Sequence, residues 1–219
     1  MRPPDMPEDL LVLARAVKGF MPEEEGTYLF HLARERFAHG PALEIGSYCG
    51  KSAVYLGAAA REAGGTVFTL DHHRGSEENQ AGWEHHDASL VDPGTGLIDT
   101  LPALRATIAH AGLEEQVVAV IGPSTTVARL WRTPLSLVFI DGGHAEAPAQ
   151  DDYFGFAPWV MAGGTLVIHD VFERPQDGGQ APYHLWTRAV RSGAFEPLGT
   201  VGSMRALTRV RGDAGERVG

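Results

Sequence analysis

The chain is poor in three things, and each shortage excludes a class of protein. Cys49 is the only cysteine among 219 residues, which excludes an internal disulfide framework and a metal cluster held by several thiolates. Lys and Arg number 18 against 28 Asp and Glu, and the formal net charge is −10. This balance argues against nucleic acid or an anionic membrane as the partner, because phosphate binding needs a surplus of basic side chains. No apolar run approaches the roughly 20 residues that a membrane-spanning helix requires.

The rest of the composition is typical of a soluble globular chain. Apolar residues make up 43% and charged residues 21%, which is enough for a core and argues against disorder. The length fits one domain. Prolines and acids occupy residues 1–13, where a signal peptide would have a basic and then an apolar stretch. We therefore expect a cytoplasmic protein with N-terminal helices in 1–40, a main domain over 41–210 and a flexible tail over 211–219.

Short apolar runs alternate with helical stretches along the main domain. Strands are predicted at 42–45, 66–70, 117–121, 135–140 and 165–169, with two closing strands near 195–198 and 204–208. Helices are predicted at 51–63, 101–111, 125–131, 147–161 and 183–192. Apolar strands separated by helices are typical of a parallel sheet covered on both faces, so the predicted fold class is α/β.

Residues 72–100, after the second predicted strand, break this alternation. The segment has little periodicity and holds four of the ten histidines. A stretch of this length inside a compact domain is typically a functional lid, an interface arm or disordered. Two clusters rich in His and aromatic residues, His72–Arg74 and Trp83–His86, argue against disorder. A lid over the substrate and the arm of a homodimer both stay open, and one segment could serve as both.

The strongest motif is Glu44-Ile45-Gly46-Ser47-Tyr48-Cys49-Gly50-Lys51-Ser52, between the first strand and its helix. Glycines permit a tight turn and a close approach to a ligand, and the helix N-terminus that follows favours an anionic group. The segment is not a P-loop, because residue 45 is Ile where that motif needs Gly. It also lacks the middle glycine of the dinucleotide pattern, since residue 48 is Tyr. The pattern E-x-G-x-x-x-G-x-S remains, with a plain strand-to-helix turn as the alternative.

Two further segments indicate a nucleoside site. Asp71 ends the second strand, 21 residues after Gly50, where a carboxylate can accept hydrogen bonds from ribose hydroxyls. Gly122-Pro123-Ser124 follows the third strand. Taken alone, Asp71 would more often be a solvated strand-end residue, and the second segment reads equally well as a simple turn.

Acids and histidines follow the fourth and fifth predicted strands. The fourth strand runs into Asp141-Gly142-Gly143-His144, and the fifth ends in His169-Asp170. In an open parallel sheet, ligands bind outside the carboxyl ends of the strands, so these side chains should face one cleft. Carboxylates and imidazoles are ligands for Mg²⁺ and similar divalent ions. Capping of turns is the alternative for each residue singly, but two such pairs on adjacent strands favour a site.

Over roughly residues 43–171 these motifs resemble the class I S-adenosylmethionine-dependent methyltransferases, and most closely the metal-dependent sugar O-methyltransferases of the macrocin type. Size and composition also resemble the mycobacterial 1-O-methyltransferases of methylmannose polysaccharide synthesis. The resemblance implies a Rossmann-like class I methyltransferase sheet with helices on both faces and a long insertion after the second strand. It implies S-adenosylmethionine and Mg²⁺, or a similar divalent ion, as cofactors. The implied partner is a small hydroxyl acceptor, a sugar or oligosaccharide such as a mannoside.

The resemblance also implies roles for individual residues. His144 is the expected general base, and the expected metal ligands are Asp141, His169 and Asp170, although the family has an acid where this chain has His169. The expected cofactor-binding residues are Glu44, Gly46, Ser52, Asp71, Ser124 and Asp141. Asp152 is either a further member of the site or an inward-facing polar residue.

Two other functions are alternatives to this one. A nicotinamide-dependent oxidoreductase is disfavoured by the missing middle glycine and by the lack of a recognisable hydride acceptor site. A non-catalytic cofactor-binding protein on the same fold is the other alternative.

Overall fold

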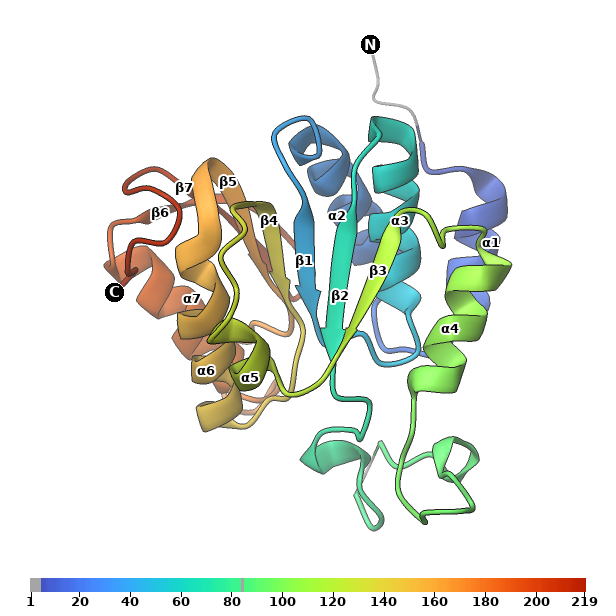
Figure 1. Cartoon of the computed structure of the whole chain (residues 1–219). Coiled ribbons are helices and arrows are strands. Elements are labelled where there is room, and N and C mark those ends of the chain that lie inside the picture. The colour runs from blue at the N-terminus through green and yellow to red at the C-terminus, as the bar shows by residue number, and fades with distance from the viewer. Residues whose placement is uncertain (1–4, 84) are drawn as a thin grey trace.

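The computed structural model describes residues 5–83 and 85–219. The first four residues of the expected N-terminal helical region lie outside the described residues, and so does Glu84 of the cluster Trp83–His86. The described chain forms a seven-stranded sheet in the order β3-β2-β1-β4-β5-β7-β6 (Figure 1). Five strands are parallel: β1 (Ala42–Ile45), β2 (Val67–Asp71), β3 (Val117–Ile121), β4 (Leu135–Ile140) and β5 (Val160–Ile168). The hairpin of β6 (Phe195–Val201) and β7 (Met204–Arg209) adds to β5 in antiparallel fashion.

Helices cover both faces of the sheet (Figure 1). One layer contains α1 (Glu8–Ala16), α2 (Glu23–Arg36), α3 (Lys51–Ala63) and α4 (Leu101–His110). The other contains α5 (Ser124–Ala128), α6 (Glu146–Phe156) and α7 (Ala181–Arg191). The insertion after β2 carries the short 3₁₀ helices η1 (Glu77–Asn79) and η2 (Ala88–Leu90), and η3 (Ala157–Trp159) follows α6. This is the predicted α/β architecture, with helices on both faces of the sheet and a long insertion after β2.

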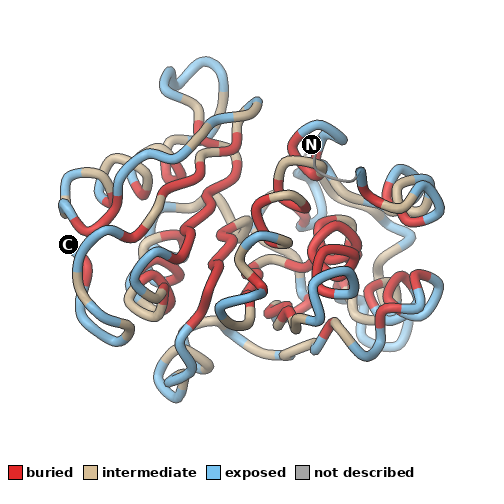
Figure 2. Tube along the Cα trace, turned by 90° about the horizontal axis from the view of Figure 1, so that it is seen from above, coloured by how far each residue is buried: buried red, intermediate tan, exposed pale blue. Residues whose placement is uncertain are grey.

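The alternation of side chains along β1 and β4 separates two cores. Leu43 and Ile45 pack with the layer of α6 and α7, whereas Ala42 packs with the layer of α2 and α3. All four residues of β1 are buried, as expected for a central strand covered on both faces. Figure 2 shows buried segments along the central strands and exposed segments in the connecting loops. In the described part of the chain, no helix combines the length and the apolar character needed to cross a bilayer.

Most predicted elements are confirmed to within a few residues, and two adjoining boundaries are wrong. The helix predicted over 147–161 ends at Phe156, and Pro158 lies in η3. Proline lacks a backbone N–H and clashes with the preceding helical turn, which accounts for the early end. Strand β5 therefore begins at Val160, which pairs with Leu135, and not at Thr165.

Candidate functional site

The glycine-rich loop after β1 packs tightly against the end of β4. Gly46 has a φ of +96°, and Gly50, the N-cap of α3, has a φ of +91°. A Cβ atom on Gly46 would lie 2.0 Å from the carbonyl oxygen of Asp141. No residue with a side chain fits there without displacing the loop. The motif thus holds the loop after β1 against Asp141, the first residue after β4.

Asp71 ties the same loop to the end of β2. Its carboxylate accepts hydrogen bonds from the backbone N–H of Tyr48 at 2.9 Å and of His73 at 2.7 Å. Tyr48 has a φ of +46°, a conformation that few residues other than glycine adopt. Each carboxylate oxygen can accept a second hydrogen bond, and the side chain is only half-buried. Asp71 is therefore fixed by the loop and keeps acceptor capacity, as its predicted role toward a ribose requires; that role stays a prediction.

Glu44 and Ser52 lie deeper than Asp71. Glu44 is fully buried and Ser52 nearly so. Burial raises the pKa of Glu44 to about 7, against the opposing effect of the Ser52 and Thr69 hydroxyls. Among the described residues, Oε1 of Glu44 has no hydrogen-bond partner. These two side chains support the loop from beneath, and their direct contact with a cofactor stays a prediction.

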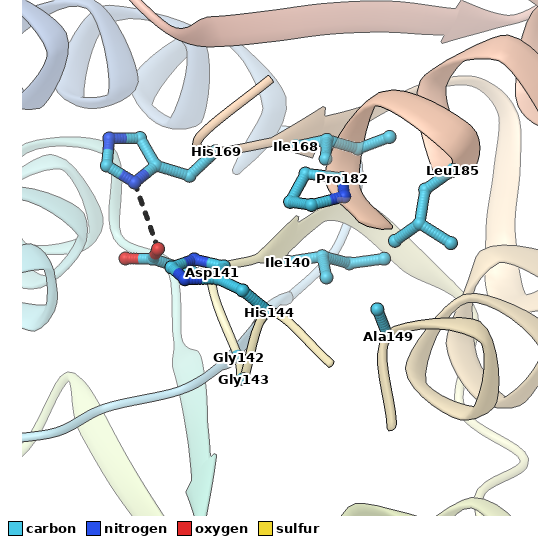
Figure 3. A pocket seen from close by; sticks show the side chains of 10 residues that line it. All are labelled: Ile140, Asp141, Gly142, Gly143, His144, Ala149, Ile168, His169, Pro182 and Leu185. Carbon is cyan, nitrogen blue, oxygen red and sulfur yellow. Dashed lines mark hydrogen bonds and ion pairs between the residues drawn. The ribbon is translucent and has the colours of Figure 1, made fainter. Parts of the chain in front are cut away.

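The predicted acids and histidines at the ends of β4 and β5 do come together. The ligand atoms of Asp141, His144 and Asp170 all lie within 4.8 Å of one another. Nε2 of His144 is 3.1 Å from Oδ2 of Asp170. Figure 3 shows Asp141 and His144 beside the ring of His169 in a small pocket. Two carboxylates and an imidazole at this spacing fit a divalent cation.

His169 lies behind this set, between three carboxylates. Its Nε2 is 2.6 Å from Oε2 of Glu25, and its Nδ1 is 3.0 Å from Oδ1 of Asp141 and 3.3 Å from Oδ2 of Asp170. Burial disfavours the charged ring, but the carboxylates outweigh it and raise the pKa of His169 far above its usual value. A doubly protonated imidazole has no lone pair for a metal. The ligand role predicted for His169 stays a prediction, and the converging set contains His144 in its place.

The protonation of the other members follows from the same contacts. The hydrogen bond with Asp170 raises the pKa of His144 to about 9, although burial opposes the charge. Burial raises the pKa of Asp141, partly offset by His169. Burial also opposes ionisation of Asp170, but hydrogen bonds from both histidines prevail and lower its pKa. The protonation state of each residue in the cluster therefore depends on the charge of its neighbours.

Two members of this network were missed in the sequence. Glu25 on α2 is buried and accepts hydrogen bonds from the backbone N–H and the hydroxyl of Ser203, at 2.5 and 3.0 Å. Glu78 in η1 lies 3.2 Å from Nδ1 of His144, so the insertion after β2 reaches the cluster. In the sequence, Glu25 and Glu78 each stand next to other acidic residues, and nothing local distinguishes them from solvated surface acids. Glu25 ends the run Glu23-Glu24-Glu25, which reads as the start of a helix.

The remaining predicted residue, Ser124, opens α5 after β3 and is half-buried. Asp152 on α6 is buried and near it: burial raises the pKa of Asp152 to about 6, and a hydrogen bond from the Ser124 hydroxyl opposes the rise. The structure therefore places Asp152 beside Ser124, and Asp152 is not among the three residues whose ligand atoms converge.

Comparisons with known proteins bear on the family and the fold of this chain. The methyltransferase domain family matches residues 43–171. The methyltransferase PaMTH1 of Podospora anserina, solved with SAH, is similar with a TM-score of 0.69 and 17% identity over 96% of this chain and 91% of that one. The O-methyltransferase TomG of Streptomyces achromogenes, solved with SAM, has a TM-score of 0.63 and 19% identity over 94% and 91%. MycE of the mycinamycin pathway, solved with Mg and SAH, has a TM-score of 0.56 and 19% identity over 95% of this chain and 56% of that one. At these identities the likeness to solved structures shows the fold alone, which is the predicted Rossmann-like class I methyltransferase fold.

Proposed function

Since this chain belongs to the methyltransferase domain family, we propose that it transfers the methyl group of S-adenosylmethionine to a hydroxyl of a small acceptor, a sugar such as a mannoside. One observation carries the proposal. The backbone of Gly46, in the cofactor loop, packs against the carbonyl of Asp141, the first member of the acidic cluster. A nucleoside site and a cluster able to deprotonate a hydroxyl therefore share one edge of the sheet.

The cofactor would lie along the ends of β1, β2 and β3. Asp71 would accept from the ribose hydroxyls, and Ser124 would lie beside the adenine. The backbone around Gly46 and Asp141 would contact the methionine portion, with Glu44 and Ser52 beneath. The structures of PaMTH1 and TomG, which hold SAH and SAM on this fold, support the choice of cofactor.

Asp141 and Asp170 would hold a divalent ion such as Mg²⁺. The third ligand would be His169, as predicted from the sequence, or His144, which converges with the two carboxylates and is the more exposed of the two rings. When bound, such an ion lowers the pKa of a coordinated hydroxyl. MycE, solved with Mg, supports this part of the proposal.

We assign the role of general base to His144. Its side chain is 28% exposed, whereas that of His169 is 3% exposed. An acceptor hydroxyl can therefore approach the ring of His144 but not that of His169. A base must be neutral, and the hydrogen bond with Asp170 raises the pKa of His144 to about 9. His144 would therefore act as a base once Asp170 binds a divalent ion instead of hydrogen-bonding to the ring, and its neutral nitrogen would take the proton while the acceptor oxygen is aligned with the methyl group.

The acceptor would lie under residues 72–100. The insertion carries exposed Trp83 and several histidines, and such side chains suit stacking on and hydrogen bonding to a sugar. Its Asp87 and Ser89 also bond to Lys18 in the loop before α2. A homodimer in which this segment reaches a second subunit, and a cytoplasmic location, stay predictions.

Calorimetry and a methyl-transfer assay test the proposal. We expect heat with S-adenosylmethionine and none with NAD, and product formation on a panel of hydroxyl acceptors that falls when a chelator is added. His144→Ala should abolish transfer. His184→Ala is the matched control, because His184 also bonds to a carboxylate but lies on α7, and it should not affect transfer. Absence of heat with S-adenosylmethionine would contradict the function.

The same variant separates the two roles of His144. Lost transfer with unchanged Mg²⁺ binding identifies a base, and lost Mg²⁺ binding identifies a ligand. Transfer that survives both chelation and His144→Ala would refute the metal-and-base mechanism.

A further inference from the structure

Asp152 is a buried carboxylate with an unused hydrogen-bond acceptor. It lies in the middle of α6 with 4% of its surface exposed. Among the described residues its Oδ1 has no hydrogen-bond partner. Buried polar atoms are nearly always paired in folded proteins, so an unpaired carboxylate oxygen indicates a partner that binds later.

The position of Asp152 points to the cofactor end of the sheet. Its Oδ2 lies 2.7 Å from where a Cβ atom on Gly142 would be, so the carboxylate packs against the backbone directly after β4. The hydroxyl of Ser124, the first residue of α5, hydrogen-bonds to it, and the negative charge of Asp71 acts on it. Asp152 therefore lies between the loops after β3 and β4, within electrostatic reach of the acid assigned to the ribose.

We propose that Asp152 accepts a hydrogen bond from the exocyclic amino group of the cofactor's adenine and makes the site specific for that base. The inference rests on the proposed function, which supplies the cofactor. With the ribose at Asp71, the base extends toward the loops after β3 and β4. A carboxylate only accepts hydrogen bonds, so it matches an amino group and repels an oxo group in the same place.

The protonation state agrees with this role. The pKa of Asp152 is raised to about 6, first by burial and then by the charges of Asp151 and Asp71. The carboxyl is therefore ionised at pH 7.5, which is the state that an acceptor requires. The neighbouring hydroxyl of Ser124 stabilises this ionised form.

A competing explanation is that Asp152 only holds the backbone of Gly142 in place. The two roles differ in what they predict for a cofactor with an altered base. S-inosylhomocysteine has an oxo group where S-adenosylhomocysteine has the amino group, and its N1 carries a hydrogen where N1 of adenine is an acceptor; the ribose and the homocysteine portion are the same. A scaffold residue affects both ligands alike, whereas an adenine contact distinguishes them.

Calorimetry of the full chain at pH 7.5 with these two ligands tests the inference. We expect the wild type to prefer S-adenosylhomocysteine by roughly 10- to 100-fold, the usual effect of one hydrogen bond to a charged group. Asp152→Ala should bring the ratio of the two dissociation constants close to 1. Asp152→Asn, which keeps the shape and adds a donor for the oxo group, should shift the preference toward S-inosylhomocysteine. Asp71→Asn is the matched control and should weaken both ligands equally, because both contain the ribose.

The outcomes separate this inference from the proposed function. A wild-type chain that does not bind S-adenosylhomocysteine overturns both. A wild type that binds both ligands equally well, or an Asp152→Asn variant that keeps the wild-type ratio, overturns the adenine contact alone. Circular dichroism establishes that each variant is folded. The change in the ratio of the two dissociation constants from the wild type to the isosteric Asp152→Asn variant decides the question even if Asp152→Ala does not fold.

Discussion

Glu44→Gln is expected to stabilise the protein much more at alkaline than at acidic pH. Glu44 lies in the middle of β1, is fully buried, and accepts a hydrogen bond from the hydroxyl of Thr69. Burial raises the pKa of its carboxyl from 4.5 to about 7. For an acid with a raised pKa in the folded state, the stabilising effect is complete below about pH 4.5. It is lost as the pH rises through about 7, because the buried group must then ionise.

The size of the effect follows from the shift in pKa. One pKa unit corresponds to about 1.4 kcal/mol, so the carboxyl should remove about 2–3 kcal/mol of stability between pH 5 and pH 8.5. Glutamine keeps the size and an oxygen for the Thr69 hydroxyl but cannot ionise. The difference in melting temperature between Glu44→Gln and the wild type should therefore grow by roughly 4–12 °C between the two pH values.

Thermal unfolding followed by circular dichroism at both pH values measures this difference. Glu196→Gln is the control, because Glu196 is an exposed acid on another strand and the change removes the same charge. The control should alter the melting temperature by a similar small amount at both pH values. If Glu44→Gln gave the same melting-temperature difference at pH 5 and pH 8.5, the buried carboxyl would not titrate as argued.

Three further predictions concern the loop, the cluster and the insertion. Gly46→Ala should abolish the heat of S-adenosylmethionine binding, because the added Cβ would lie 2.0 Å from the carbonyl oxygen of Asp141; unchanged binding would contradict the loop assignment. Asp170→Asn should weaken Mg²⁺ binding and slow methyl transfer by at least roughly 10-fold, with cofactor affinity unchanged in calorimetry. An equal loss of cofactor affinity would argue against a separate metal role. Lys18→Ala removes the ion pair to Asp87 and should speed limited proteolysis within 72–100, while the free energy of unfolding changes by less than about 1 kcal/mol. An unchanged cleavage rate would show that the ion pair does not hold the insertion.

Elements with local signals could be predicted from the sequence. Helix α3 has its predicted bounds because Gly50 and Gly64, both with positive φ, flank it. Strands β1, β3 and β4 also have their predicted bounds, since each is a short apolar run. The start of β5 depends on pairing between Val160 and Leu135, a contact between distant parts of the chain that no local pattern records.

In the candidate site, too, residues with a local sequence signal could be predicted and residues that depend on distant contacts could not. Asp141, His144 and Asp170 could be placed together because the carboxyl ends of parallel strands meet at one edge of a sheet. Glu25 could not, because it reaches His169 only through the packing of α2 against the sheet. Its surroundings come from the turn between β6 and β7, where a Cβ on Gly202 would lie 2.1 Å from Oε1 of Glu25. A buried acid whose partners are distant in the sequence cannot be recognised from the local pattern of apolar and polar residues.

Exposure divides the cluster into a rear and a front. The side chains of Glu25 and His169 are 2% and 3% exposed, whereas those of Asp141, His144 and Asp170 are 21–28% exposed. The charged ring of His169 lies between carboxylates that would otherwise repel one another, so the acidic cluster is held together within the folded chain. A buried charge without its partner is strongly destabilising, which accounts for Glu25 behind the ring. The front carries the groups that solvent can reach, and it is there that the proposed ion and acceptor hydroxyl would approach the cluster.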